Sequence, residues 1–494
     1  MSRRLTPLLR PLLGPLRIET PLGLFSVLWA FGTALNSLEN SPLSGLMVYP
    51  LVVLLLFNPE QLWAIATFAV MHAILLALRL PGIANHSVLA LLVDTGLVIG
   101  CLRVWTRRGA SAATSADGAQ RALWDAVRGP LKATLVLVYA FAVFDKLNRS
   151  FFDPTVSCAV SQVGKMLTLH GITGWPADPS VFQYNIYLTL IVETAIVALL
   201  LWPRAASLGA TLGLLFHLGL GWARFYDFAT LAFALYLFFL PWDRVQDRLS
   251  RMRSQTGTLF FVAFAGVALC SVIFYGVLEN PVIVPGARWS LTADTLLCLC
   301  WTAAVVPMLW PIFRGRDIEA DPRRWHGTAL AWVVPAIALL NGATPYLGLK
   351  TVSNYSMFSN LRTEGGMTNH LLVPAGRFFI SDRQNDLVRV ESMLRPNPPH
   401  WPWWSVATGH SDPRWSAEIP GARIPFSEIR RIVQNWHDLG VPTATVVFER
   451  NGERQVVQDA YADAEIMRPM PWLERKLFSY RVVDPDGMPA RCRW

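Results

Sequence analysis

Long, nearly uncharged apolar runs between residues 22 and 348 constrain this chain more than any other feature of its sequence. A helix that crosses the hydrocarbon core of a bilayer needs about 20 mostly apolar residues. In lipid every backbone polar group must be bonded internally, and apolar runs of this length satisfy that condition as helices. We therefore predict an all-α polytopic membrane domain of about eleven transmembrane helices. The predicted spans are residues 22–39, 43–57, 61–80, 86–105, 131–148, 184–202, 205–222, 225–241, 257–279, 290–313 and 327–348.

The first two spans have weaker signals than the others. The segment 31–40, "FGTALNSLEN", is polar enough for an amphipathic helix that lies in the membrane interface instead of crossing it. The run 43–57 is short for a span. An interfacial helix at 22–39 therefore stays open as an alternative.

Arginine-rich segments give the predicted orientation. They are the N-terminal residues 1–20 and the loops 105–130, 242–256 and 314–326. With eleven spans all four lie on one side, which the positive-inside rule identifies as the cytoplasm. Residues 1–20 then form a basic cytoplasmic N-terminus without the features of a cleavable signal peptide. The loop 149–183 and residues 349–494 lie on the opposite side.

The composition changes after residue 348, where we predict a small extracytoplasmic α+β domain at 349–494. "TATVVFERNGERQVVQDA" alternates polar and apolar residues around Asn451-Gly452, a dipeptide typical of hairpin turns. "PFSEIRRIVQNWHDLG" predicts a helix with Ser427 as N-cap and Gly440 after its last turn.

The composition also indicates the partners of the chain. With 53% hydrophobic and 16% charged residues, it is too apolar for a soluble globular protein, and its first partner is the lipid bilayer. The net charge of +9 does not indicate nucleic-acid binding, because the arginines lie in short loops between apolar runs. The six cysteines form no CxxC motif, so we predict no metal site. Cys158 and Cys492 lie on the predicted extracytoplasmic side, where they could form a disulfide or remain two separate thiols.

Ionisable residues within the spans are candidate functional residues, because charge is costly in lipid. They are His72, Asp94, Asp145, Lys146, Glu193, His217 and Asp294, with His86 at the start of the fourth span. The predicted topology places His86, Lys146 and His217 at or near the extracytoplasmic ends of their helices. A partly buried lysine can act as a base, and a histidine can bond a developing oxyanion or pass a proton. Apolar surroundings suit a lipid-soluble substrate such as a quinol.

Each of these residues also has a structural interpretation. Lys146 could extend to the membrane surface, as lysines at span ends commonly do. His86 could cap its helix, and His217 could bond a neighbouring helix. Glu193 lies in the middle of a span and needs a partner or a proton.

A polar segment, "MFSNLRTEGGMTNHLL", follows the last span and contains two further candidates, Asn369 and His370. Its adjacent glycines predict a tight turn near the membrane. The segment could cover a site near Lys146 and His86, or it could be an ordinary connector.

Four segments resemble the vitamin K-dependent γ-glutamyl carboxylases and their bacterial relatives, which share the horizontally transferred transmembrane (HTTM) domain. They are "GIANHSVLALLVD", "YAFAVFDKLNRSFFDPTVSCA", "YNIYLTLIVETAIVALLLWP" and "FHLGLGWARF", and they occur in the order of that family. The resemblance covers about residues 20–280, within a membrane domain of residues 21–348. Its most specific parts are the K-L-N and N-H-S segments.

The resemblance implies a quinol-dependent, carboxylase-like enzyme in a bacterial inner membrane. Lys146 would deprotonate reduced vitamin K or menaquinone, and oxygen would then yield a strong base. This base would take the γ-proton of a glutamate in a membrane-proximal peptide or protein, and the carbanion would capture carbon dioxide. His86 would assist the carboxylation, and we expect His217 to be the third catalytic residue.

A second function class remains open, namely a non-catalytic membrane accessory or scaffold that assists export, maturation or immunity of another protein. In that case Lys146 and His86 would make only structural hydrogen bonds. The two hypotheses differ in one expected feature. Catalysis requires Lys146, His86 and His217 around a common cavity that a lipid can enter.

Overall fold

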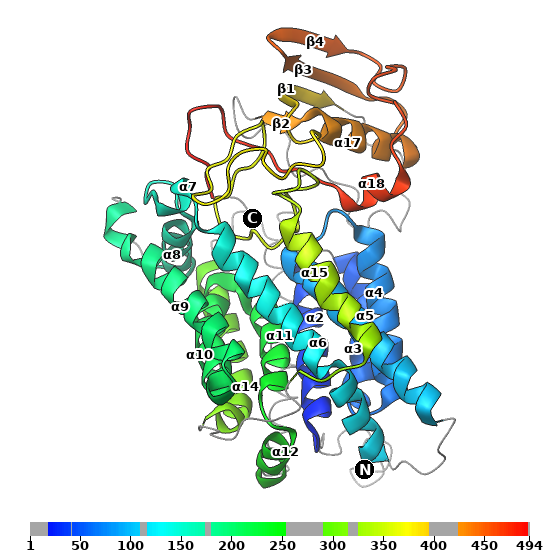
Figure 1. Cartoon of the computed structure of the whole chain (residues 1–494), viewed down its shortest axis with the longest axis vertical. Helices are drawn as coiled ribbons and strands as arrows, with labels where there is room; N and C mark the ends of the chain where they lie inside the picture. Colours follow the sequence, from blue (N-terminus) through cyan, green and yellow to red (C-terminus); the bar gives the residue numbers. More distant parts are fainter. Residues whose placement is uncertain are drawn as a thin grey trace, which may run out of the picture.

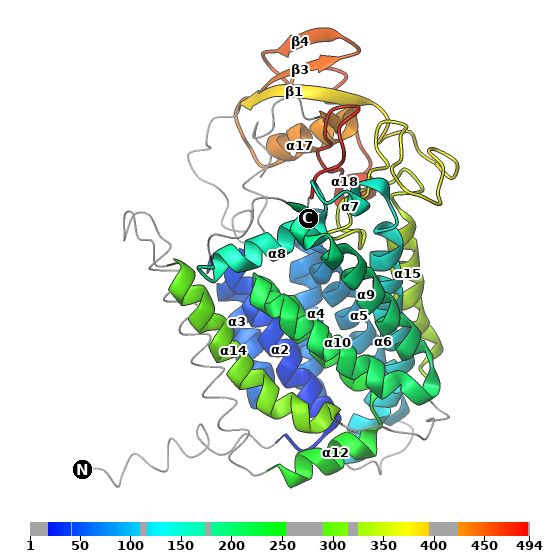
Figure 2. The ribbon, with the colours of Figure 1, turned by 90° about the vertical axis from the view of Figure 1, so that its left-hand side faces the viewer.

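The computed structural model describes residues 18–40, 42–108, 116–172, 179–252, 290–314, 325–394 and 423–492. Helices dominate up to Ala343, and a small antiparallel sheet follows nearer the C-terminus. Figure 1 shows the long helices gathered in one bundle, with the sheet beyond one end and α12 (Trp242–Arg251) at the other. Figure 2 shows α8 (Cys158–Leu169) lying across the end of the bundle that faces the sheet.

The helices of the bundle agree with most of the predicted spans. They are α2 (Pro21–Asn40), α3 (Pro42–Phe57), α4 (Leu62–Arg79), α5 (Asn85–Arg108), α6 (Ala116–Asp145), α9 (Tyr184–Leu201), α10 (Ala206–Leu220), α11 (Tyr226–Tyr236), α14 (Ser290–Phe313) and α15 (Val333–Ala343). Each overlaps one predicted span. The remaining prediction, 257–279, lies outside the described residues.

Six helical stretches within the described ranges are long and apolar enough to cross a membrane. They are Leu62–Arg79, Asn85–Arg107, Gly118–Asp145, Ser180–Leu201, Pro203–Phe239 and Asp294–Phe313, with shorter apolar helices at Met47–Phe57 and Ala329–Ala343. These stretches are typical of a membrane protein. The predicted number of about eleven spans is not confirmed by this count.

The stretch Pro203–Phe239 consists of two helices that run in opposite directions. The backbone leaves helical geometry at Ala223 and at Arg224, where φ is 72°. Beyond this break, α11 returns along α10, so that the Tyr236 ring packs over Gly213 and a Cβ at that glycine would collide with the ring. The predicted separation into spans 205–222 and 225–241 follows the same break.

The interfacial alternative for the first span is wrong, because α2 lies inside the bundle. Leu24, Leu28 and Phe31 are completely buried. Gly32 brings the α2 backbone against Leu231 of α11 with no space for a side chain. Its polar residues Thr33, Asn36 and Ser37 are buried as well.

The predicted loop 105–130 is partly wrong, because α6 begins at Ala116 and continues without a break to Asp145. Its charged residues made the first turns look like a loop, yet they have partners in the fold. Arg121 pairs with Asp243 of α12 at 2.7 Å. Arg128 donates hydrogen bonds to the backbone oxygens of Phe238 and Leu240.

The sheet belongs to a small α+β unit with its own core. Its four strands, β1 (Leu387–Leu394), β2 (Arg423–Pro425), β3 (Thr445–Arg450) and β4 (Glu453–Val457), are antiparallel in the order β2-β1-β3-β4. Helix α17 (Phe426–Asp438) covers one face, and its Ile429, Val433 and Trp436 pack with Val446 and Phe448. This core is separate from that of the helical bundle.

The local predictions for this unit are confirmed except at one position. Asn451 and Gly452 connect β3 to β4 with φ values of 53° and 82°, as a two-residue hairpin turn requires. Gly440 follows α17 with φ of 74°. Ser427 is not the N-cap, because α17 begins at Phe426 and the Ser427 hydroxyl donates to the Arg383 oxygen instead.

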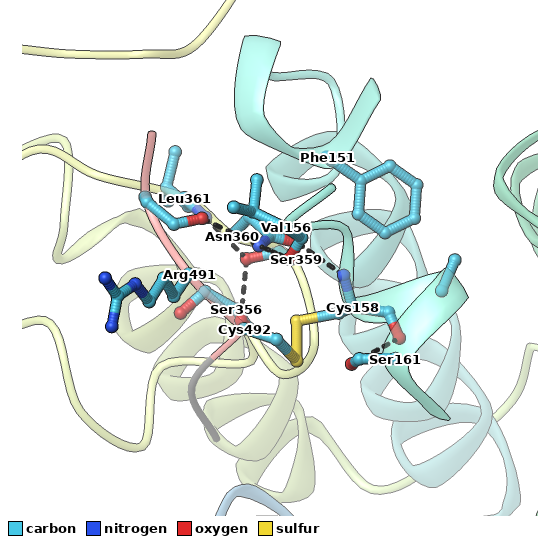
Figure 3. The surroundings of a disulfide bond; sticks show 12 residues. Phe151, Val156, Cys158, Ser161, Ser356, Ser359, Asn360, Leu361, Arg491 and Cys492 are labelled. Atoms are coloured by element: carbon cyan, nitrogen blue, oxygen red, sulfur yellow. Dashed lines mark hydrogen bonds between the residues drawn. A yellow bond between two sulfur atoms is a disulfide. The ribbon is translucent and has the colours of Figure 1, made fainter. Parts of the chain in front are cut away.

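A disulfide between Cys158 and Cys492 joins the start of α8 to the last described segment of the chain, which is one of the two alternatives that the sequence left open. Figure 3 shows Asn360 beside this bond. The Asn360 side chain accepts from the Cys158 amide at 2.8 Å and donates to the oxygens of Val156 and Ala490. The Asn360 side chain is therefore hydrogen-bonded to both of the segments that the disulfide joins.

Removal of this disulfide should lower stability. We expect Cys158→Ala to reduce the free energy of unfolding by about 2–5 kcal/mol, because the crosslink restricts the unfolded chain. The melting temperature of the purified protein checks this, with Cys101→Ala, which removes a buried free thiol, as the control. Equal melting of the Cys158→Ala variant and the wild type would contradict the expectation.

Candidate functional site

Lys146 follows the last residue of α6, and its side chain turns into the bundle. Its Nζ donates to Glu193 of α9 at 2.8 and 3.1 Å and to the Ala142 backbone oxygen at 3.1 Å. The side chains of Lys146 and Glu193 are only 5% and 9% exposed. An anchoring lysine would extend outward to the membrane surface, so that interpretation of Lys146 is wrong.

His217 belongs to a hydrogen-bonded chain of rings next to this ion pair. The Tyr139 hydroxyl lies 2.8 Å from His217 Nε2 and is also hydrogen-bonded to the Tyr236 hydroxyl. Tyr139 lies about one helical turn before Ala142, whose backbone oxygen accepts from Lys146. Lys146 and His217 therefore face one polar network, which is contributed by α6, α9, α10 and α11.

The ring of Phe228 lies between His86 and this network. Its ring stacks on Phe228 at 5.9 Å, and Phe228 packs against His217 at 5.0 Å. His86 Nε2 is 3.3 Å from the Asp227 carboxylate, but the angle is unsuitable for a hydrogen bond. The structure thus places His86 near the predicted site without bonding it to Lys146 or His217.

Several buried polar atoms at the site have no hydrogen-bond partner among the described residues. They include Nε2 of His86 and Nδ1 of His217. Buried polar atoms are usually bonded, so such exceptions are common where a ligand or water binds. Three clefts lined by described residues lie away from Lys146, Glu193 and His217, whose side chains pack against protein atoms.

Residues 350–372, which we term the cap segment, contact the chain next to both His86 and Lys146. On the His86 side, the Tyr355 amide donates to Asn85 at 2.6 Å. On the Lys146 side, the Leu371 amide donates to the Leu147 oxygen at 2.9 Å, and the Asn369 oxygen accepts from the Arg149 amide. The segment is thus bonded to the neighbours of both predicted catalytic residues.

Asn369 and His370 hold the cap segment on the end of α6. The Asn369 amide donates to the side chains of Asn148 and Ser150. His370 Nε2 donates to the Phe144 oxygen at 2.9 Å, while its Nδ1 accepts from the Leu372 and Val373 amides at 3.1 Å. Both residues therefore hold the backbone around Lys146 in place.

Sequence reasoning missed two residues of the network, Tyr139 and Tyr236, and it missed Asp227 beside His86. Tyr139 lies seven residues before Lys146, two helical turns away on the same face, and this spacing could have indicated it. Nothing in the sequence distinguishes Tyr236 from the other aromatic residues of the predicted span 225–241. Asp227 lies near the junction of the predicted spans 205–222 and 225–241, where charge costs little, but it is 2% exposed.

Comparisons with known proteins gave no relative for this chain. No protein-family model, no curated protein and no solved structure matches it.

The ion pair of Lys146 and Glu193 gives the first prediction at this site. Glu193→Gln and Lys146→Met should each destabilise the protein by about 3–5 kcal/mol, because each leaves a buried charge without its partner. The double change Lys146→Met with Glu193→Gln should recover most of this loss, since it removes both charges. Melting temperatures measure the cycle, and additive losses in the double variant would contradict a direct pairing.

The cap segment gives a second prediction, on pH. Burial lowers the pKa of His370 from its usual 6.5, so the folded state favours the neutral ring. The unfolded state then binds more protons below about pH 6.5, and the contribution of His370 to stability is lost as the pH falls. We expect faster hydrogen exchange in residues 350–372 at about pH 5 than at about pH 8, after correction for intrinsic rates. His370→Phe should abolish this difference, and a difference that persists in the variant would contradict the assignment.

Proposed function

We propose that this chain is an integral membrane enzyme in which Lys146 accepts a proton from the hydroxyl of a lipid-soluble quinol. The observation that carries the proposal is the buried pair of Lys146 and Glu193 beside the Tyr139–His217 network. Transfer of a proton from Lys146 to Glu193 leaves a neutral amine and a neutral acid. The amine is then a base next to hydrogen-bonding groups that can carry the proton away.

The proposed reaction follows from the resemblance to vitamin K-dependent carboxylases. One quinol and one oxygen molecule give one quinone epoxide and one water. The base formed on the way could drive carboxylation of a glutamate in a membrane-proximal peptide. His86, which lies beyond Phe228, would serve that second half, while His217 would act through Tyr139.

The proposed topology has about eleven spans in a bacterial inner membrane, with the N-terminus in the cytoplasm and residues 349–494 outside. Two observations support it. The arginine-rich segments lie on one side in this arrangement. The disulfide of Cys158 and Cys492 suits an oxidising compartment on the other side.

One observation favours the non-catalytic alternative of an accessory or scaffold protein. Lys146, Glu193 and His217 are buried and line none of the clefts described above. A quinol would reach Lys146 only if the surrounding helices or the cap segment moved. The enzyme therefore requires a conformational opening that the scaffold does not.

An epoxidation assay distinguishes the enzymatic proposal from the non-catalytic alternative. Purified protein is supplied with reduced menaquinone or a vitamin K analogue and with oxygen, and the epoxide is measured by chromatography. We expect turnover by the wild type and a loss of about 10²–10⁴-fold in Lys146→Ala, because a positioned base contributes that much. No epoxide from the wild type with several quinols would contradict the enzymatic proposal.

Two further variants sharpen the assay. Lys132 is a matched control, since it is also a buried lysine on α6 but lies near the rings of Phe239 and Trp325 at the opposite end. Lys132→Met should retain the activity per folded molecule. Glu193→Gln should lose activity, as Lys146→Ala does, because an amide cannot take up the proton of the lysine.

A further inference from the structure

A second buried acid–base pair, His72 and Asp94, lies outside the site described above. His72 Nδ1 of α4 is 2.7 Å from Asp94 Oδ2 of α5, and the Trp29 indole donates to Asp94 Oδ1 at 2.9 Å. Asp94 is completely buried, and His72 is 6% exposed. Both carboxylate oxygens have partners, so Asp94 holds the His72 ring in one orientation.

His72 lines a cleft enclosed by α2, α3, α4 and α5, which we term the α2–α5 cleft. The space enclosed within the cleft is about 30 Å³, which suits one small polar group. Its walls combine apolar residues such as Val48 and Leu75 with polar ones such as Thr33. A hydroxyl group fits this enclosed part, while the chain that carries the hydroxyl lies toward the open side of the cleft.

Two polar groups on the wall have unused hydrogen-bonding capacity among the described residues. His72 Nε2 has no hydrogen bond, since only Nδ1 contacts Asp94. Thr33 Oγ1 is buried without a partner, although Thr33 is only 2% exposed. Among the other polar wall groups, Asn36 donates to Ser87 and Ser37 donates to the Thr33 oxygen. Arg79 of α4 also lines the cleft and has an interaction of its own.

His72 Nε2 and Thr33 Oγ1 can together bond one hydroxyl group. With its Nδ1 proton donated to Asp94, His72 keeps a lone pair on Nε2 and can accept an O–H. Thr33 can donate to the oxygen of the same hydroxyl. A hydroxyl is both donor and acceptor, so it can use both groups, whereas an ether oxygen can use only Thr33.

The surroundings of the cleft indicate where such a ligand comes from. Along α4, Met71, Ile74 and Leu78 are 45–52% exposed, which is typical of a face in contact with lipid. Met47 of α3 lines the cleft and is itself 37% exposed. A molecule dissolved in the bilayer can therefore meet the cleft from its apolar side.

We propose that the α2–α5 cleft is a binding site for the hydroxyl end of a slim lipid-phase alcohol, with the hydroxyl donated to His72 Nε2 and bonded by Thr33. The chain of the alcohol lies along the apolar wall toward Met47. This site is independent of the proposed quinol chemistry at Lys146.

Photolabelling of the full-length protein in detergent tests the site. The probe is octan-1-ol with a diazirine on its chain, and labelled residues are identified by mass spectrometry. We expect label on cleft residues such as Met47 and Leu75, suppressed by excess octan-1-ol but not by octyl methyl ether. No label in the cleft, or equal competition by the ether, would overturn the proposal.

Variants separate the role of the hydroxyl from general apolar binding. Thr33→Val keeps the shape of the side chain and should lower cleft labelling about two- to tenfold, which is the effect of one lost hydrogen bond. His72→Leu should lower it at least as much, and unchanged labelling in both variants would overturn the proposal. Thr33→Val alone decides if His72→Leu does not fold. Lys146→Ala should keep the wild-type labelling, so failure of the quinol assay and failure of this site are distinguishable.

Discussion

Acid–base pairs buried between neighbouring helices organise the helical bundle. In a medium of low dielectric constant an unpaired ion costs several kcal/mol, and a partner on a neighbouring helix removes most of that cost. The pairs are Lys146 with Glu193, His72 with Asp94, and Arg224 with Asp294. Each pair connects two different helices or helix ends. The same interactions therefore fix which faces of the helices meet and where acid–base chemistry is available.

The cap segment couples the bundle to the α+β unit. Its Glu364 is completely buried and pairs with Arg481 at 2.8 Å, while its other end is bonded around Lys146. Positive φ values, which residues other than glycine rarely adopt, occur at Ser353, Tyr355, Phe358 and Asn360. Such conformations persist only where the surroundings hold them, so this segment depends on contacts with both parts of the protein.

Hydropathy predicted most of the helices, because burial in lipid requires long apolar runs whatever the partners are. It failed at the start of α6, where Arg121 and Arg128 resemble loop residues until their partners are known. The hairpin at Asn451-Gly452 was predictable because its turn is a local property of two residues.

The site was less predictable than the fold. The sequence indicated that Glu193 needs a partner or a proton, but not that Lys146, 47 residues away, supplies it. Hydropathy does not report which face of a helix meets which neighbour. The tyrosines of the network were hidden for the same reason, since their hydroxyls matter only once the helices α6, α10 and α11 are packed.

The disulfide described above also changes the connectivity of the molecule. Cys158 and Cys492 are 334 positions apart, so the bond closes a covalent ring that contains α9 to α15, the cap segment and the sheet. A single break of the backbone anywhere in that ring leaves the two pieces joined. The ring can close only once Cys492 lies beside the start of α8, so the oxidised bond records that the two distant segments have been brought together by the fold.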